Sequence, residues 1–189
     1  TARDIGGLTM SASDKVWQNK KNIYRTKVVI RDVDGKALSA GRDYEKLLRY
    51  EYGAAVTLPD GTVRMAGEEV SGNDILPAGT LLRVTASAKG NNYTGTVSCD
   101  YRITKADIGK AKVTIPVQTY TGREIRPDGE MQVKLNGRIL SGDNYEITGY
   151  TNNINKGTAT VTIKGKNDCG GVKTVKFRIK RKGFLWWWR

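Results

Sequence analysis

The residue types that most often carry out catalysis are scarce in this 189-residue sequence. It contains no histidine, the commonest general base and a frequent metal ligand, and only two cysteines. Cys99 and Cys169 lack the Cys-x-x-Cys spacing of zinc and redox sites. No nucleophile elbow and no phosphate-binding loop occurs. The sequence therefore predicts a protein that is not an enzyme and that needs no metal or cofactor.

Binding is the chemistry that the remaining side chains favour, and the first candidate segment lies near the N-terminus. Residues 15–31 contain six Lys and Arg side chains, two aromatic residues and no acid. Aromatic and Arg side chains are enriched at the energetic centres of interfaces. The candidate contact residues are Trp17, Lys20, Lys21 and Tyr24. The alternative is an ordinary solvated strand in which Trp17 serves as a core anchor.

A second candidate lies further along the chain, where an apolar run is broken by Asp60-Gly61. This dipeptide between apolar runs predicts a β-hairpin. The tip mixes apolar and charged residues, as binding loops on a rigid β scaffold often do. Its candidate contact residues are Leu58, Arg64 and Met65. The alternative is that the segment covers the edge of a sheet.

The C-terminal segment is the third candidate, because large apolar side chains stand there between basic residues. Trp favours the membrane–water interface, and Lys and Arg are attracted to anionic head groups. The segment is too short to span a bilayer. We expect envelope contact through Lys180, Arg181, Lys182, Trp186, Trp187, Trp188 and Arg189. Docking of the tail onto the protein itself is the alternative.

Two weaker patterns have structural interpretations. Asp32-Val-Asp-Gly35 lacks the further oxygen ligands of a calcium loop, so we expect a hairpin turn. Cys99 alternates with Val97 and Tyr101, which predicts a core-facing thiol in a strand. A bridge between the two cysteines is the alternative.

The elements that must position these candidates are revealed by an internal repeat. Thr1-Ala-Arg-Asp-Ile-Gly6 matches Thr104-Lys-Ala-Asp-Ile-Gly109, and Trp17 falls opposite Tyr120. Four further anchors follow in the same order in both copies. They pair Gly41–Tyr44 with Gly142–Tyr145, Gly79-Thr80 with Gly157-Thr158, Lys89-Gly90 with Lys164-Gly165, and Tyr101–Ile103 with Phe177–Ile179. The sequence therefore predicts two copies of one module.

The copies differ by an insertion in the first. Tyr44 and Gly79 are 35 positions apart, Tyr145 and Gly157 are 12 apart, and 35 − 12 gives 23 extra residues. We expect module one at residues 1–103, module two at 104–181 and a basic, Trp-rich tail at 182–189.

Alternation of apolar and polar residues predicts strands throughout. Ala159, Val161 and Ile163 share one face of a strand, and so do Leu82 and Val84 in the first copy. Short strands separated by turn signals are typical of small β-sandwiches. We expect an all-β chain of two tandem Ig-like sandwiches, with a β-grasp-like module as the alternative; a single helical turn is expected near residues 107–110.

The repeat motifs resemble a known family. Tyr120-Thr-Gly-Arg123, Gly142-Asp-Asn-Tyr145, Lys156–Gly165 and Lys89–Thr96 are similar to the Ig-like surface repeats of Gram-positive gut bacteria, especially clostridial relatives. Such repeats serve as spacers, adhesin segments and enzyme appendages, and some resemble modules that bind host immunoglobulin. The resemblance implies a secreted protein displayed on the bacterial surface.

Two functions follow as hypotheses. In the first, module one binds a host protein, possibly immunoglobulin, or a host glycan, with no role in nucleic-acid binding. In the second, the modules are rigid spacers with an envelope-contacting tail. The chain begins at Thr1 without a signal-peptide pattern, so we expect a mature form or a piece of a longer secreted protein.

Overall fold

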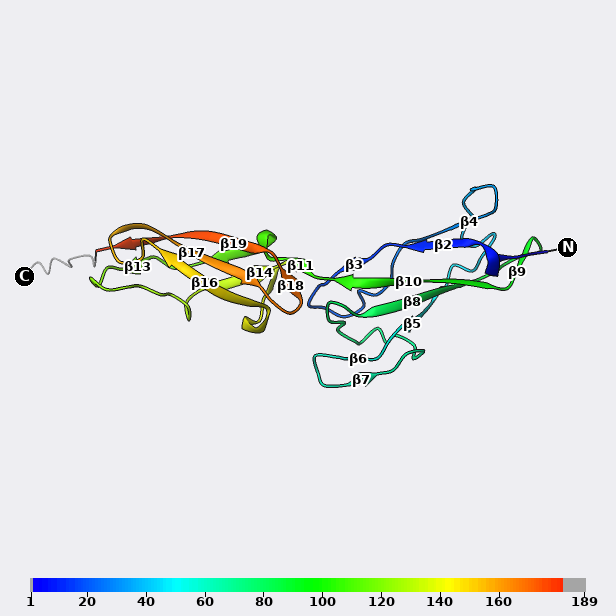
Figure 1. Ribbon diagram of the computed structural model, residues 1–189, viewed down its shortest axis with the longest axis horizontal. Coiled ribbons are helices and arrows are strands. Elements are labelled where there is room, and N and C mark those ends of the chain that lie inside the picture. The colour runs from blue at the N-terminus through cyan, green and yellow to red at the C-terminus, as the bar shows by residue number, and fades with distance from the viewer. Residues whose placement is uncertain (1, 182–189) are drawn as a thin grey trace, which may run out of the picture. The chain divides into compact units, whose positions relative to one another are not determined.

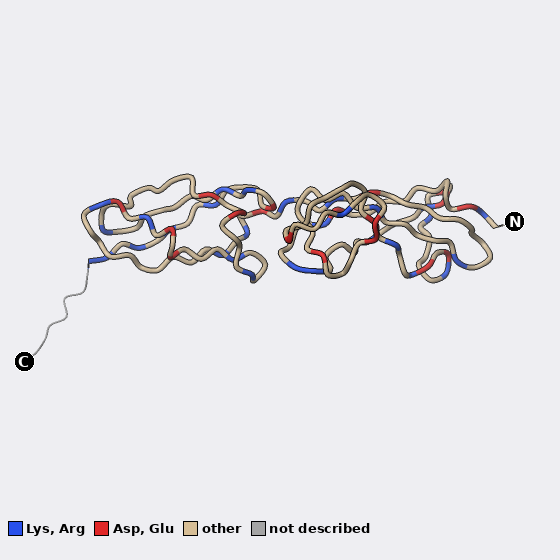
Figure 2. The backbone as a smooth tube through the Cα atoms, turned by 90° about the horizontal axis from the view of Figure 1, so that it is seen from below, with Lys and Arg blue, Asp and Glu red and all other residues tan. Residues whose placement is uncertain are grey.

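The computed structural model describes residues 2–181, and these form an all-β protein (Figure 1). The chain divides into two compact units, unit 1 at Thr1–Lys105 and unit 2 at Ala106–Arg189. The sequence placed this boundary after residue 103. Basic and acidic residues are interspersed along the backbone of both units (Figure 2). No helix among the described residues is long and apolar enough to cross a membrane.

Unit 1 is built on a four-stranded sheet in the order β3-β10-β8-β5, in which β3 is parallel to β10 and the other neighbours are antiparallel. These strands are β3 (Lys15–Val16), β5 (Arg49–Tyr52), β8 (Leu81–Ser87) and β10 (Thr96–Thr104). Three two-stranded pairings accompany it: β1-β9, β2-β4 and β6-β7. Their strands are β1 (Arg3–Asp4), β2 (Thr9–Ala12), β4 (Val28–Arg31), β6 (Val56–Thr57), β7 (Val63–Arg64) and β9 (Tyr93–Thr94).

Unit 2 repeats this plan with a four-stranded sheet in the order β13-β19-β17-β16 and a three-stranded sheet in the order β12-β14-β15. Here β13 runs parallel to β19, as β3 does to β10. The strands are β11 (Ala106–Asp107), β12 (Lys112–Thr114), β13 (Gln118–Thr119), β14 (Gln132–Leu135), β15 (Arg138–Ile139), β16 (Tyr145–Thr151), β17 (Gly157–Gly165), β18 (Cys169–Gly170) and β19 (Val172–Lys180).

The strand registers show how the two copies correspond. The amides of Trp17 and Tyr120 donate to the carbonyl oxygens of Thr104 and Lys180, each at 2.8 Å, which confirms that these aromatic residues occupy matching positions. Two of the sequence anchors were misaligned. Leu82 lies opposite Tyr101 as Ala159 lies opposite Phe177, so Thr80, not Gly79, corresponds to Gly157.

The second misalignment concerns Lys89. Its amide donates to the carbonyl oxygen of Asp43, and the amide of Lys166 donates to that of Asn144. Lys89 therefore corresponds to Lys166 rather than to Lys164. The neighbours that follow agree, because Gly90 and Asn167 both have positive φ, at 79° and 53°. The sequence comparison paired Lys89-Gly90 with Lys164-Gly165 because the residues are identical. The backbone hydrogen bonds instead pair Lys89 with Lys166.

Each unit has its own core, formed where the alternating faces of β8, β10, β17 and β19 are buried. In unit 1, Leu82, Val84 and Tyr101 are buried, and in unit 2 the corresponding residues include Val161 and Phe177. The predicted helical turn is a 3-10 helix at Ile108–Lys110 (η2), matched by Ile5–Gly7 (η1) in unit 1. A further 3-10 turn, η3, spans Gly142–Asn144. Cys99 is a partly exposed thiol on the inward face of β10.

Candidate functional site

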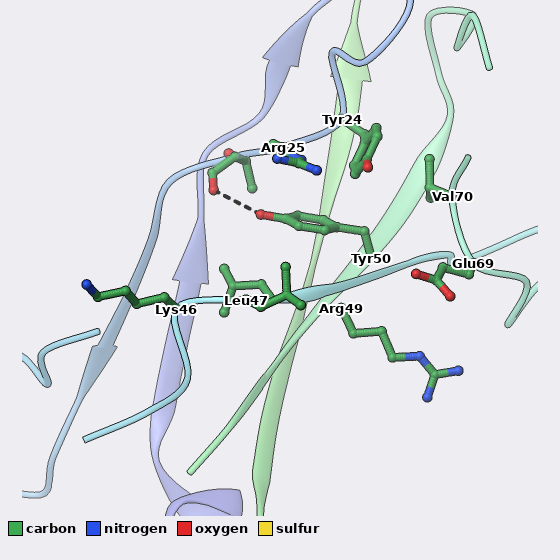
Figure 3. Close-up of a pocket in the computed structure, with 10 residues that line it drawn as sticks. Tyr24, Arg25, Lys46, Leu47, Arg49, Tyr50, Glu69 and Val70 are labelled. Carbon is green, nitrogen blue, oxygen red and sulfur yellow. Dashed lines mark hydrogen bonds between the residues drawn. The ribbon is translucent and has the colours of Figure 1, made fainter. Parts of the chain in front are cut away.

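A groove of about 460 Å³ opens on unit 1 and brings together three segments that are far apart in the sequence (Figure 3). Tyr24–Thr26 come from the basic-aromatic segment, and Glu69 and Val70 come from the insertion. Lys46–Tyr50 comprise the segment before β5 and the first two residues of β5. The sequence singled out the first two segments separately. Only the fold places them along one groove, which we call the unit 1 groove.

Two tyrosines form the floor of the unit 1 groove. The rings of Tyr24 and Tyr50 meet edge to face, with centroids 5.2 Å apart. Tyr50 directs its hydroxyl to the carbonyl oxygen of Thr26 at 3.5 Å, and the hydroxyl of Tyr101 donates to that of Tyr24. Burial raises the pKa of Tyr50 above its usual value. Tyr50 is therefore neutral at physiological pH, and the ring contact and hydrogen bonds hold both tyrosines in place.

The rim of the groove is apolar and basic. The side chain of Leu47 is 84% exposed, the largest exposed fraction among the large hydrophobic residues of the described chain. The guanidinium of Arg25 lies 5.8 Å from the centroid of the Tyr24 ring, which is a cation–π distance. Within the described residues, neither Arg25 nor Lys46 forms an ion pair. The groove thus offers an exposed leucine and two uncompensated cations, with Glu69 as the acidic residue of its lining.

The insertion contributes to this site by covering the edge of the sheet. β5 is the last strand of the four-stranded sheet. The amide of Tyr52 donates to the carbonyl oxygen of Glu68, and the amide of Val70 donates to that of Tyr50, both at 2.9 Å. These bonds pair the outer edge of β5 within the chain, as the alternative interpretation of the insertion expected. The predicted hairpin is also present, with Val56–Thr57 paired antiparallel to Val63–Arg64.

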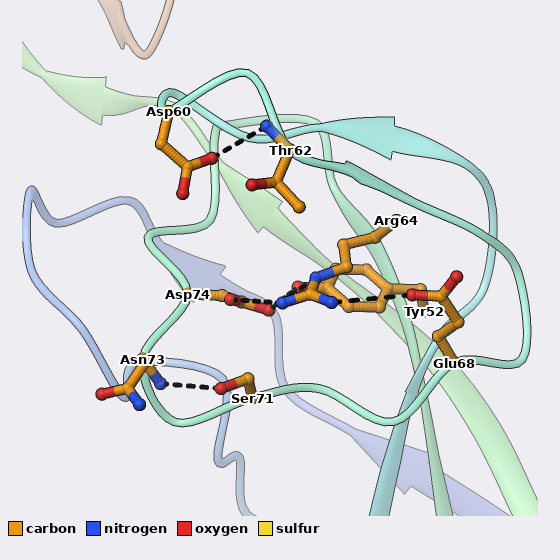
Figure 4. Close-up of polar contacts among 8 residues, drawn as sticks. All are labelled: Tyr52, Asp60, Thr62, Arg64, Glu68, Ser71, Asn73 and Asp74. Carbon is orange, nitrogen blue, oxygen red and sulfur yellow. Dashed lines mark hydrogen bonds and ion pairs between the residues drawn. The ribbon is translucent and has the colours of Figure 1, made fainter.

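A polar cluster holds the insertion against unit 1 (Figure 4). The guanidinium of Arg64 donates two hydrogen bonds to the carboxylate of Asp74, at 3.0 and 3.1 Å. The buried hydroxyl of Tyr52 donates to the same carboxylate at 2.7 Å. Burial, followed by this hydrogen bond, raises the pKa of Tyr52. Glu68 lies 3.8 Å from Arg64.

The structure separates the sequence-predicted contact residues into two groups. Trp17, Tyr24 and Leu58 are between 3% and 8% exposed. Trp17 therefore serves as the core anchor that the alternative interpretation described, and the side chain of Leu58 is buried rather than exposed on the hairpin. Arg64 is engaged by Asp74. The burial of Trp17 and Leu58 does not support the prediction that they present a contact surface, and Arg64 has a structural partner. Tyr24 is mostly buried but lines the unit 1 groove.

Three predicted contact residues remain exposed. Lys20, Lys21 and Met65 all face solvent, and Met65 is 55% exposed. They do not line the unit 1 groove. The groove residues that sequence reasoning missed are Lys46–Tyr50. The sequence contains a signal for this part of the groove, because Leu47-Leu48 is an apolar pair that follows a turn motif. In the second copy, the corresponding turn is followed directly by strand β16.

The predicted envelope-contact residues fall mostly outside the described part of the chain. Lys182, Trp186, Trp187, Trp188 and Arg189 lie outside residues 2–181. Lys180 is the last residue of β19 and Arg181 follows it, and both side chains are exposed. The backbone of Lys180 accepts a hydrogen bond within the sheet, consistent with a module that ends at residue 181, and the envelope contact of its side chain stays a prediction.

Comparison with known proteins gives little beyond the architecture. The sequence matches no protein-family model and no curated protein. Among solved structures, a crystal structure of Drosophila N-cadherin EC1-4 aligns with 90% of this chain at 22% identity and a TM-score of 0.23. The chain spans about half, 48%, of that structure's length. A TM-score this low does not establish a shared arrangement, and the all-β assignment rests on this chain's own sheets.

Proposed function

We propose that this chain is a non-enzymatic binding module of a secreted bacterial cell-surface protein, and that the unit 1 groove holds part of a host protein. The observation that carries the proposal is the exposed Leu47 beside the fixed aromatic floor of Tyr24 and Tyr50. Exposed apolar side chains next to rigid aromatic residues are typical of interface centres. The bacterial surface location is supported by the sequence motifs that resemble clostridial repeats.

The charge of the rim indicates the kind of partner. Arg25 and Lys46 line the groove together with Leu47, and neither forms an ion pair among the described residues. A matching surface would offer carboxylates around an apolar depression, since complementary charge sets specificity and association rate. Immunoglobulin is the host protein that the family resemblance suggests, and a mucin glycan is the second partner to examine.

The proposal predicts that one exposed apolar residue matters and another does not. We expect the full chain to bind immobilised immunoglobulin, and Leu47→Asp to weaken that binding at least tenfold, on the order of a single interface hot spot. Val33, which is 74% exposed on another part of unit 1, supplies the matched control. Val33→Asp should change binding by less than about twofold, because surface substitutions away from an interface have small effects. Biolayer interferometry at two salt concentrations measures both.

Equal losses in the two variants would place the contact outside the groove. The complete absence of binding to immunoglobulin and to mucin glycans would favour the second hypothesis, a spacer built of two modules with the same strand order. Deletion of residues 53–76 is a less informative test, because it would also expose the edge of β5 that Glu68 and Val70 cover.

A further inference from the structure

A second surface, on unit 2, differs in its side-chain composition from the unit 1 groove. The residues of β13, β16, β17 and β19 alternate between the core and solvent. We call the solvent-facing side of this sheet the outer face of unit 2. It comprises Thr119, Glu146, Thr148, Thr151, Thr158, Thr160, Thr162, Lys164, Val172, Thr174, Lys176, Arg178 and Lys180.

The outer face of unit 2 carries a row of cations. Lys176, Arg178 and Lys180 alternate along β19 and are all exposed, so neighbouring members of the row are about 6.8 Å apart along the strand. Lys164 adds a fourth cation on the adjacent β17. None of the four forms an ion pair within the described residues. Glu146 is the single acid on this face, so its net charge is 4 − 1 = +3.

The corresponding face of unit 1 shows that the fold does not require this charge. There, Arg83 pairs with Asp100 at 2.8 Å and Arg49 pairs with Glu51 at 2.7 Å. Asp100 corresponds to Lys176, because each lies one residue before the aromatic residue that marks the repeat. The same sheet position therefore holds an ion-paired acid in one unit and an uncompensated lysine in the other.

Hydroxyl groups fill the space between these cations. Thr162 and Thr174 hydrogen-bond across the strands at 3.0 Å, Thr151 and Thr160 do so as well, and Arg178 donates to Thr158 at 2.9 Å. These bonds order the hydroxyl groups before any ligand arrives, which reduces the entropy lost on binding. Each hydroxyl oxygen retains acceptor capacity for a further partner.

The side chains of the outer face narrow the class of ligand. No aromatic residue lies on it within the described part of unit 2, so it lacks the stacking platform that single-stranded nucleic acids use. Val172 is its one large apolar residue, so little apolar surface is available to enter a bilayer. An array of hydroxyls and regularly spaced cations matches a polymer with regularly spaced anions and many hydroxyl groups.

We propose that the outer face of unit 2 binds a linear anionic glycan that carries sulfate or carboxylate groups. The cations of β19 contact successive anionic groups, and the threonine hydroxyls bond to the sugar hydroxyls between them. This site is separate from the unit 1 groove, and substitutions in one leave the other intact.

The test uses the full chain with heparin as the probe. Two triple variants are compared. The first removes the cation row of β19 and carries Lys176→Gln, Arg178→Gln and Lys180→Gln. The second removes three exposed cations elsewhere on unit 2 and carries Lys110→Gln, Lys112→Gln and Arg138→Gln. At about 0.1 M NaCl we expect the first variant to bind heparin at least tenfold more weakly, with the salt dependence reduced by up to about three ions. The second variant should lose less than about threefold. Neutral dextran should not bind.

Mapping on the unmodified protein provides evidence that does not depend on the variants being folded. Heparin should shift the amide signals of β17 and β19 in NMR spectra and leave those of β12 and β15 unchanged. Equal loss of affinity in both variants, shifts spread over both sheets, or duplex DNA binding as tightly as heparin at equal charge would each overturn the proposal.

Discussion

At the scale of single residues, the two units differ at a buried position that follows a turn. Asp43 in unit 1 is 4% exposed and accepts hydrogen bonds from Arg42, at 2.8 and 3.0 Å, and from the amide of Ser39 at 2.8 Å. Asn144 occupies the same position in unit 2 and accepts a bond from the amide of Asp168 at 3.1 Å. Both residues organise a turn, but only Asp43 can titrate.

Because only unit 1 has a titratable carboxylate at this position, we expect acid to lower the stability of unit 1 through Asp43, with no matching effect of Asn144 in unit 2. The hydrogen bonds from Arg42 lower the pKa of Asp43 below its usual value. A carboxylate whose folded pKa lies below its unfolded pKa, about 3.9, stabilises the fold above that pH. Its contribution is lost as the pH falls through the folded pKa. Asp43→Asn should therefore weaken unit 1 at neutral pH and make its decline below about pH 4 less steep.

Urea unfolding between pH 2 and 7, followed through the amide signals of β8 and β10, measures this effect. Asp34→Asn is the control, because it makes the same chemical change at an exposed turn of unit 1. The control should keep the acid profile of the unmodified protein. An Asp43→Asn profile as steep as the control's would show that other carboxyl groups govern acid unfolding.

At the scale of elements, the repeated Asp-Ile-Gly motif fixes the start of each unit. Asp4 and Asp107 cap 3-10 turns by accepting hydrogen bonds from the amides of Gly6 and Gly109. Each carboxylate also lies against a glycine of positive φ. This glycine is Gly95 in unit 1 and Gly171 in unit 2. The motif therefore needs a glycine about ninety residues later in unit 1, which local sequence patterns do not reveal.

The close approach predicts an unusual cost for a small substitution. A Cβ atom at Gly95 would lie 2.2 Å from Oδ1 of Asp4, so Asp4 would have to rotate away and the cap on Gly6 would be lost. Gly35 has the same φ, about 80°, but open space around it. Gly35→Ala should lower the free energy of unfolding by about 1 kcal/mol through backbone strain. Gly95→Ala should cost about 1 kcal/mol more, the typical value of a cap.

Urea denaturation of both variants, followed by circular dichroism, compares these costs. Equal destabilisation by the two alanines would mean that the Asp4 cap adds nothing to unit 1. A Gly95→Ala, Asp4→Ala double variant should be about as stable as Gly95→Ala alone, because the cap on Gly6 is already lost in the single variant.

At the scale of the whole molecule, each unit contains complete sheets and its own buried core. Domains with these properties fold independently. We expect residues 1–105 and 106–189 to fold when produced separately, each with a cooperative thermal transition and dispersed amide NMR signals. A chain of residues 1–94 is the control. It lacks β10, an inner strand of the four-stranded sheet, and should not fold. Failure of either unit to fold alone would show that its stability depends on the other.

Much of the architecture could be predicted from the sequence alone, because it depends on local patterns. Alternation identified the long strands such as β17 and β19, and Asp60-Gly61 identified the β6-β7 hairpin. The repeat identified Trp17 and Tyr120 as equivalent. These features are local because a strand's faces and a turn's conformation depend on neighbouring residues.

Only the tertiary structure decided what each side chain does. Alternation gives the face on which a residue lies, but not the strand or loop that packs against that face. Tyr24 and Val70 are 46 positions apart in the sequence, yet both line the unit 1 groove. The sequence left Trp17 open as either a contact residue or a core anchor and suggested Leu58 as a contact residue, and in the structure both side chains are buried. The sequence thus determined the modules and their strands, and long-range packing determined which residues are left to bind.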